Sequence, residues 1–469
     1  MDTDTPVIQQ AYRFALDLTV EQEAFLAACA GASRFWFNQG LALVKQRLDD
    51  RAEGHQVDMP WSYKGLCVAF RGDAVKDELA PWRSEVVTGS YQAGLEALGK
   101  ALRNYSAARK AGRKVGFPRF RAKGRSHESA IFQRPRIPDN RHVDLDRRLG
   151  PVRTKESLRK LTRLLATDPL ARVMRSTVQR VNGGWVISFT VQRSAKRRRA
   201  RRPDAVVGVD VGLARLATLS TGHAVDNGRP LQTALRTLRR LQRQLDRQRR
   251  ANNPCNYHPD RRAKKGCSAW VKSARMLRTE RRIARLHERV ANLRRHQAHE
   301  FTTALTREYG VIGVETLTVK NMLANPRLAR HISDVGWGTV LSQLAYKTSW
   351  SDGSMLVAAD RFYPSSKTCS ACGAVKAKLC LTDRVFTCDE PSCGHEQDRD
   401  LNAALNLARM AQRHAQAEDI SQSYVARIGR FTPTARGGQV SLVHPDEHSP
   451  MKCEASPDAS QRREAQAAA

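Results

Sequence analysis

Half of the ten cysteines in this chain lie in one short stretch, between Cys369 and Cys393. Two closely spaced pairs stand out there, Cys369 with Cys372 and Cys388 with Cys393. Two thiols on each of two facing turns are typical of tetrahedral zinc, whereas disulfides are rare in a reducing compartment. The stretch is too short for a sizeable core of its own, so we expect a small module that folds around a metal ion.

The ligand set of this module has alternatives. The second pair is separated by four residues instead of two, and His395 and Cys380 lie near enough in sequence to replace one of its members. Buried thiols without a metal are the other interpretation. The set we expect to bind Zn²⁺ is Cys369, Cys372, Cys388 and Cys393. Four protein ligands leave no position for a substrate, so the role of the ion should be structural.

The charge of the chain indicates a polyanionic partner. Lysine and arginine number 80 against 46 aspartates and glutamates, which gives a formal net charge of +34 spread from end to end. Nucleic acid and an anionic membrane surface both fit, but no uncharged apolar run approaches the roughly 18 residues that a spanning helix needs. The opening segment MDTDTPV lacks the order of a secretory signal, so we expect a cytosolic protein. A length of 469 residues favours two to four domains.

The first part of the chain predicts a strand followed by helices. Residues 12–18 alternate apolar and polar side chains, and Thr19 with Gln22 forms a capping box that should begin a helix. Helical periodicity continues to about Lys110. Short strands follow up to about Arg193, the clearest at 184–191 after a turn signal at 182–184. We expect a small β-barrel that the first strand completes.

A loop between these regions has the composition of a nucleic-acid contact. Residues 116–125 combine glycine and proline with alternating aromatic and basic side chains. The candidates for phosphate contacts are Arg119, Arg121 and Lys123.

The second part of the chain predicts buried strands and two long helices. Apolar strands are expected at 205–212, 216–222, 311–315 and 355–363, and an alanine-rich helix at 401–416. The long helices carry apolar seams at 231–245 and 283–305, joined through a polar loop at 252–265. Their arginine-rich faces would lie along phosphates, or form an ordinary solvated coiled-coil surface.

Three carboxylates follow apolar strands or begin a helix: Asp210, Glu315 and Asp400. Each alone could be a surface carboxylate, and Asp400 could cap the helix that follows it. Together in a basic protein they predict a cluster that binds hard cations, most naturally two Mg²⁺ ions about 3.5–4 Å apart that catalyse phosphodiester hydrolysis. Asp398 could compete for this role and Arg399 could contact the phosphate, or the two could form only a salt bridge.

Four stretches resemble, in order, the motifs of the TnpB family, the transposon-encoded ancestor of the type V CRISPR nucleases. They are 208–212, 313–315, 364–373 and 398–404. The resemblance implies a multidomain α+β fold: an RNase H-like RuvC nuclease domain with an inserted zinc-binding module, plus a wedge β-barrel with an inserted helical recognition lobe. The implied divisions are 1–18 for the first barrel strand, 19–112 for the recognition lobe, 113–203 for the rest of the barrel, 204–363 for the RuvC-like domain with the hairpin at 229–308, 364–397 for the zinc module, 398–425 for the end of the RuvC-like domain and 426–469 for a disordered tail.

The same resemblance implies an RNA-guided DNA endonuclease of the prokaryotic cytosol or nucleoid. Its metal-binding acids would be Asp210, Glu315 and Asp400, and its partners a guide RNA and a target DNA that pair with each other. A CRISPR type V effector would use the same chemistry, while a repressor that binds without cutting and a cut-and-paste transposase are the other functions considered. The sequence leaves the guide RNA, the target-adjacent motif and the number of subunits open.

Overall fold

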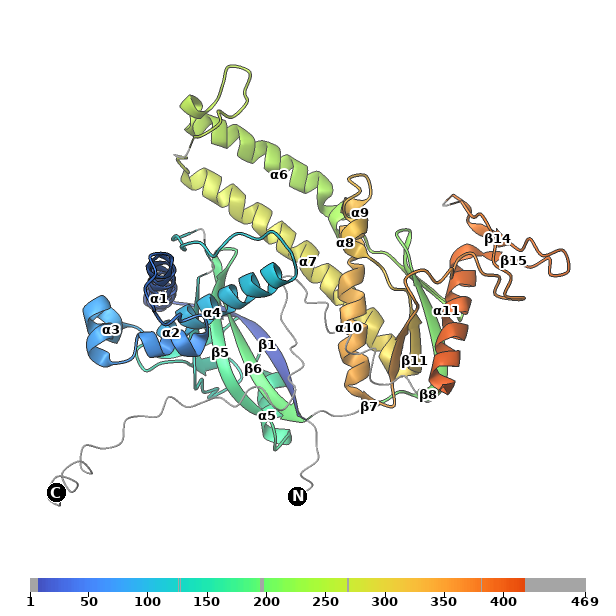
Figure 1. Ribbon diagram of the computed structural model, residues 1–469, viewed down its shortest axis with the longest axis horizontal. Helices are drawn as coiled ribbons and strands as arrows, with labels where there is room; N and C mark the ends of the chain where they lie inside the picture. The colour runs from blue at the N-terminus through green and yellow to red at the C-terminus, as the bar shows by residue number, and fades with distance from the viewer. Residues whose placement is uncertain are drawn as a thin grey trace.

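The computed structural model describes residues 7–417 except 125, 127, 195–197, 268–269 and 381. The tail expected at 426–469 and the last residues of the segment 398–425 lie outside the described residues. Figure 1 shows two bodies side by side, one built from the first half of the chain and one from the second half, with a long helical hairpin projecting between them. Among the described residues, no helix combines the length and the apolar character that a bilayer crossing requires.

The first body contains a six-stranded antiparallel sheet. Its strands are β1 (Val7–Asp17), β2 (Ser129–Phe132), β3 (His142–Asp144), β4 (Pro151–Thr154), β5 (Arg172–Val181) and β6 (Gly184–Ser194), in the order β2-β5-β6-β1-β4-β3. All six contribute to one core, to which α5 (Arg159–Thr167) adds Leu161. An isolated antiparallel bridge pairs Arg136, in the connection between β2 and β3, with Asp144 of β3.

A two-residue turn connects β5 to β6 as the sequence predicts. Asn182 and Gly183 both adopt positive φ, 51° and 83°, which is the backbone of a type I′ turn. Val181 and Gly184 pair directly across it.

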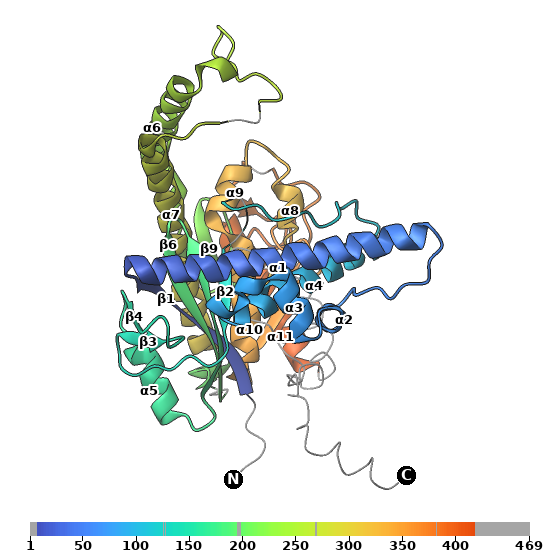
Figure 2. The ribbon, with the colours of Figure 1, turned by 90° about the vertical axis from the view of Figure 1, so that its left-hand side faces the viewer.

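Helices fill the segment between β1 and β2, as predicted. They are α1 (Val20–Ala52), α2 (Tyr63–Ala69), α3 (Asp73–Leu79), the short 3-10 helix η1 (Pro81–Glu85) and α4 (Gly89–Lys110). The predicted capping box begins α1: the Thr19 side chain accepts from the Gln22 amide, and the Gln22 side chain accepts from the Thr19 amide. The helices pack around Trp36, Leu41 and Leu95, and Figure 2 shows α1 crossing this body along its whole width.

The second body is built on a five-stranded mixed sheet. Its strands are β8 (Arg202–Val211), β9 (Arg215–Leu219), β10 (Ala224–Asp226), β11 (Tyr309–Val314) and β13 (Met355–Ala358), in the order β10-β9-β8-β11-β13. Strands β8, β11 and β13 are parallel, and β9 is antiparallel to β8. The strand expected to reach Tyr363 ends at Ala358, because Asp360 begins a turn by accepting a hydrogen bond from the Phe362 amide. Two small ladders pair β7 (Arg198–Arg199) with β12 (Ser351–Asp352) and β14 (Val385–Thr387) with β15 (Glu396–Asp398).

Helices cover both faces of this sheet (Figure 1). On one face α7 (Ala274–Glu308), α9 (Ala329–Val335) and α10 (Trp337–Ser349) pack on β8 and β11, and the short α8 (Val319–Met322) precedes α9. On the other face α11 (Arg399–Gln416) packs against β8, β11 and β13. It approaches so closely that a Cβ at Gly208 would stand 1.9 Å from the Ala404 carbonyl oxygen, and one at Gly313 would stand 2.5 Å from that of Leu407.

The projecting hairpin consists of α6 (Pro230–Asn252) and α7, joined through a loop with one short 3-10 helix, η2 (Pro254–Asn256). Its base is fixed by the buried Asp334 of α9. That carboxylate accepts hydrogen bonds from the backbone amides of Leu231 and Gln232 at the start of α6 and from the Arg294 guanidinium of α7. One charged group therefore sets the direction in which both helices leave the sheet.

Candidate metal centre and acidic site

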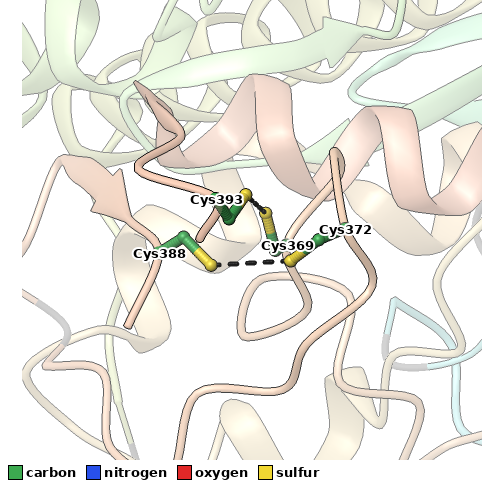
Figure 3. Close-up of side chains that lie close together, drawn as sticks. All are labelled: Cys369, Cys372, Cys388 and Cys393. Carbon is green, nitrogen blue, oxygen red and sulfur yellow. Dashed lines mark hydrogen bonds between the residues drawn. The ribbon is translucent and has the colours of Figure 1, made fainter. Parts of the chain in front are cut away.

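The four expected cysteines meet at one point, from both sides of the β14 region (Figure 3). Their sulfur atoms all lie within 4.8 Å of one another; Cys369 Sγ is 3.8 Å from Cys393 Sγ, and Cys372 Sγ is 3.6 Å from Cys388 Sγ. Four sulfurs bound at about 2.3 Å around a tetrahedral zinc ion stand about 3.8 Å apart. The four thiols therefore could hold a metal ion with little movement.

The two alternative ligands lie outside this cluster. His395 Nε2 is 3.2 Å from Ser370 Oγ and 3.4 Å from Gln397 Oε1, so its ring is engaged with polar side chains. Cys380 is exposed, and its amide donates to Asp383. The wider spacing of Cys388 and Cys393 is accommodated by a turn in which the Cys393 amide donates to the Glu390 carbonyl.

Without a bound cation, the pKa values of the thiols in the cluster differ. Burial opposes ionisation of Cys369, but the backbone amides of Cys372 and Ala371 and the neighbouring thiols outweigh it and lower its pKa to about 6. The amide of Glu390 favours ionisation of Cys388, but burial and the neighbouring cysteines prevail and raise its pKa to about 12. A set of four thiolates therefore needs a bound cation to balance its charge.

The three expected acids lie at one edge of the second sheet. Asp210 is the ninth residue of β8, and Glu315 directly follows β11, whose Val314 pairs with Val209 of β8. The two acids are thus neighbours across adjacent parallel strands, with side chains on the same face. Asp400 lies in the first turn of α11, the helix that packs on that face over Gly208. Strand register and helix packing therefore direct all three toward one another.

The acids also interact through their charges. Burial is the main cause that raises the pKa of Asp210 well above its ordinary value, and Glu315, Asp400 and Asp398 raise it further, while Arg399 lowers it. Among the described residues, the four cysteines form a group of ligand atoms within 4.8 Å, and the three acids do not form one. The carboxylates are near enough to repel each other but are not drawn together.

Neighbouring side chains hold two of the acids. The Ser365 hydroxyl donates to Glu315 Oε1, and Arg399 Nη2 lies 3.5 Å from Asp400 Oδ1. Arg399 also donates from Nη1 to the Cys380 carbonyl at 3.4 Å. Asp398, and not Asp400, caps α11, because its Oδ1 accepts the amides of Asp400 and Leu401 at 2.9 and 3.1 Å. Its other oxygen lies 3.8 Å from Arg215, so the salt bridges run from Arg215 to Asp398 and from Arg399 to Asp400.

Two buried asparagines of α11, which the sequence analysis missed, connect the cysteine module to the acidic site. Asn406 donates to the carbonyls of Ser365 and Thr368 at 2.9 and 2.6 Å. Asn402 donates to the Thr368 carbonyl at 2.7 Å and accepts from the Ser370 amide at 2.8 Å. Their spacing of four residues on an alanine-rich helix was the available signal, since buried amides need partners.

The three basic candidates of the loop after α4 differ in their surroundings. Arg119 and Lys123 are exposed. Arg121 is half-buried, its guanidinium 3.7 Å from the ring centre of Phe37, and its backbone exchanges hydrogen bonds with the Asn38 side chain at 2.8 and 3.0 Å. Arg121 therefore fastens the loop to α1, while the other two side chains face solvent.

A strongly basic, mixed α/β protein with four cysteines that could hold a metal ion and three charge-coupled carboxylates belongs among the nucleic-acid-processing proteins. Family models agree: one described as "Probable transposase" matches residues 187–325, and "Cas12f1-like, TNB domain" matches 337–407. A third, "Helix-turn-helix domain", matches 6–52, although residues 7–52 form strand β1 and the single continuous helix α1.

Proteins named "Putative RNA-guided DNA endonuclease" match most of the chain. The one from Mycobacterium tuberculosis (strain ATCC 25618 / H37Rv) is 37% identical over 428 residues, which cover 85% of this chain and 86% of the relative. One from Streptomyces pristinaespiralis is 31% identical and covered to 89%, and InsQ of Escherichia coli (strain K12) is 29% identical and covered to 91%; each match spans 85% of this chain. The chain belongs to the TnpB family.

A solved structure also aligns with the chain. The cryo-EM structure of a Cas12f1-sgRNA-target DNA complex aligns with 86% of this chain and 99% of its own, at 13% identity and a TM-score of 0.42.

Proposed function

We propose that this protein is an RNA-guided DNA endonuclease that hydrolyses phosphodiester bonds at Asp210, Glu315 and Asp400. Family membership supports a guide RNA and a target DNA as its partners, because the relatives that match over most of their length are named putative RNA-guided DNA endonucleases. We expect the prokaryotic cytosol or nucleoid as its compartment, since these relatives are bacterial. The observation that carries the proposed chemistry is the charge coupling of Asp210 with Glu315 and Asp400 at one sheet edge.

The donor set of this edge fits Mg²⁺. Carboxylate oxygens are its preferred ligands, and a buried carboxylate next to two others is destabilised until a cation balances the charge. When bound, two Mg²⁺ ions would supply an activated water and stabilise the charge that develops on the scissile phosphate. Asp210, Glu315 and Asp400 would hold them.

Other residues of this chain would orient the acids. Ser365 fixes one oxygen of Glu315, and Arg399 lies against Asp400 with a guanidinium that can approach a phosphate oxygen. Asp398 is occupied as the helix cap, so we assign it the orientation of α11 and not a metal.

The domain organisation follows the same proposal. The mixed sheet of residues 204–363, completed by α11 in 398–425, would be the RNase H-like RuvC domain, with the hairpin of 229–308 as its extension. The six-stranded sheet formed by 1–18 and 113–203 would be the wedge barrel, and 19–112 the recognition lobe.

Residues 364–397 would be a module held by structural Zn²⁺ at Cys369, Cys372, Cys388 and Cys393, since the spacing of the sulfurs suits that ion. Arg119 and Lys123 would contact the nucleic-acid backbone.

A cleavage assay tests the proposal. Protein purified with its bound RNA is sequenced for that RNA, then incubated with matching duplex DNA and Mg²⁺ beside Asp210→Ala. We expect cut products from the natural protein and loss of nearly all activity in the variant. Equal cut products from both proteins would end the assignment of the chemistry to Asp210. DNA bound by both proteins and cut by neither would end the nuclease assignment and favour the repressor. A CRISPR type V effector differs only in the source of the guide.

A further inference from the structure

The segment from Ala359 to Ser365 begins and ends beside Glu315. The Ala359 amide donates to the Val314 carbonyl at 2.8 Å, and the Thr316 hydroxyl donates to the Ala359 carbonyl at 2.7 Å. At the other end, the Ser365 hydroxyl donates to the Glu315 carboxylate. Both ends of this short excursion are thus fixed to one acid and its two chain neighbours.

Phe362 lies in the middle of this segment. It is three positions along the chain from each end, and an extended chain spans at most about 3.6 Å per residue. Its Cα therefore lies within about 11 Å of the Cα atoms of both Ala359 and Ser365. The chain length therefore keeps Phe362 in the neighbourhood of the two anchor points beside Glu315.

Hydrogen bonds define the backbone of the turn that carries Phe362. Asp360 accepts the Phe362 amide on its side chain at 2.9 Å and the Tyr363 amide on its carbonyl at 3.1 Å. Tyr363 packs against the α11 side of the sheet, and its hydroxyl donates to the Asn406 carbonyl at 3.2 Å. A hydrogen-bonded turn between two anchored residues orders the backbone at Phe362 before binding, so a ligand needs to order only the side chain.

The ring itself is almost completely exposed. Phe362 is 83% exposed, more than any other large hydrophobic side chain among the described residues. The Arg361 guanidinium lies 5.4 Å from the ring centre and forms no ion pair with another described residue. An exposed aromatic ring on a hydrogen-bonded turn, with an arginine beside it, has the chemistry that binds an unpaired base and its phosphate.

We propose that Phe362 and Arg361 form a stacking subsite for an unpaired base of the DNA strand that enters the acidic site. The inference rests on the proposed nuclease function and adds a substrate contact to it. The phenyl ring stacks on a base next to the scissile phosphate, and Arg361 neutralises a neighbouring phosphate. Because every base has an aromatic face, the subsite accepts any sequence, as a nuclease directed by base pairing requires.

Binding of single-stranded DNA tests the subsite without any cleavage. The probe is a fluorescent oligodeoxythymidine strand, and the protein is the full chain with its co-purified RNA in the Asp210→Asn background. We expect Phe362→Ala to weaken binding about 5- to 150-fold, the range of one lost stacked base, and Phe362→Trp to retain it. Val20→Ala is the matched control, since Val20 is 82% exposed but lies on α1.

Two further arms separate stacking from other roles. The protein with the natural Phe362 should bind a strand with abasic sites more weakly than the intact strand. Phe362→Ala should bind the two strands equally. Phe362→Leu keeps an apolar side chain without an aromatic face and should bind like Phe362→Ala. If Phe362→Ala binds like Val20→Ala, or Leu serves as well as Trp, the stacking subsite is wrong.

The cleavage assay distinguishes this inference from the proposed function. If the natural protein cuts DNA and Phe362→Ala changes neither the binding of single strands nor the KM of cleavage, only the stacking subsite fails. If the natural protein never cuts but single strands bind with the expected dependence on Phe362, the nuclease assignment fails and the subsite is a contact of a DNA-binding protein.

Discussion

The negative charge on Asp210 destabilises the fold when no metal ion is bound. Burial, followed by Glu315 and Asp400, raises the pKa of this carboxyl above its ordinary value. A group with a higher pKa in the folded state contributes stability below its unfolded pKa of about 3.9, and loses that contribution as the pH rises through the folded pKa. At neutral pH the ionised side chain is therefore destabilising unless a cation balances it.

Asp210→Asn should separate these two effects. Without divalent cations, the uncharged amide should raise the thermal midpoint at pH 7.5 relative to the natural protein, because it removes the buried charge. Added Mg²⁺ should raise the midpoint of the natural protein and leave that of the variant nearly unchanged. Thermal unfolding in EDTA and across a Mg²⁺ series measures both. The same Mg²⁺ response in the two proteins would contradict a metal site at Asp210.

Ser365 offers a second test at the level of one side chain. Its hydroxyl donates to Glu315, and outer partners of metal ligands typically contribute about 10- to 100-fold in metal affinity or activity. Ser365→Ala should lower cleavage by about that factor, with part of the loss restored at higher Mg²⁺. Ser366→Ala, one residue away, is the control. An unchanged Mg²⁺ dependence in Ser365→Ala would remove Ser365 from the site.

The sequence predicts the three acids but not their partners. Asp210 and Glu315 are recognisable because each follows an apolar run that must be a buried strand, and parallel neighbours place such residues at one edge. Ser365 lies fifty residues from Glu315, and its contact depends on how a turn folds back. Asp398 and Asp400 are equally good caps by residue type, and only the backbone direction at the start of α11 decides between them.

At the level of elements, glycine places α11. Gly208 and Gly313 each stand two residues before an acid, and a side chain at either would strike the backbone of the helix that carries Asp400. The repeated Gly-Val-acid pattern is visible in the sequence, but its reason appears only once the helix lies on the strands. The close approach is what brings the helical acid within range of the two strand acids.

Gly208→Ala should therefore disturb the site more than a typical core change. Its Cβ would stand 1.9 Å from the Ala404 carbonyl, so α11 must shift, at about 1–3 kcal/mol or more for overpacking. We expect a lower unfolding midpoint and a much larger loss of cleavage. Gly338→Ala is the control, because Gly338 lies exposed in α10 with nothing within 4 Å of the added Cβ, and alanine should stabilise that helix by about 0.4–1 kcal/mol. Full cleavage by Gly208→Ala would contradict the role of α11.

The cysteine module is a second element whose loss should reach the acids. Zinc removal by a chelator, or Cys388→Ser, should unfold residues 364–397 and release the carbonyls that Asn402 and Asn406 hold. Hydrogen exchange should rise in that segment and at the start of α11, while β8 and β11 stay protected, and cleavage should fall. Cys380→Ser should keep one bound zinc by elemental analysis. A chelated protein with unchanged exchange would show that the module does not depend on metal.

The whole molecule combines two bodies and a basic hairpin. The order of these parts along the chain follows from the order of the sequence motifs, so it can be predicted from this sequence alone. The direction of the hairpin does not, because it depends on the buried Asp334, which meets Leu231 of α6 across 103 residues of chain and Arg294 of α7 across 40. The sequence likewise could not decide whether the arginine faces are solvated or bound, since free and phosphate-bound arginines have the same pattern.

Salt dependence of DNA binding should decide that question. Arg236, Arg240 and Arg243 form an exposed stripe on α6 without an ion pair to any described residue. If each contacts one phosphate, replacing all three by glutamine should reduce the slope of log affinity against log salt by about 0.9 per contact, or about 2.7 in total.

The matched control replaces Arg83, Arg175 and Arg180, which pair with Asp77, Glu96 and Glu23. Both triple variants carry three positive charges fewer, which lowers the formal net charge from +34 to +31. A general effect of net charge would therefore lower both slopes alike. A fall confined to the α6 variant, measured by fluorescence anisotropy from about 50 to 200 mM salt, would identify the hairpin as a phosphate-binding arm. Equal slopes for the two variants would leave its arginines as solvated surface.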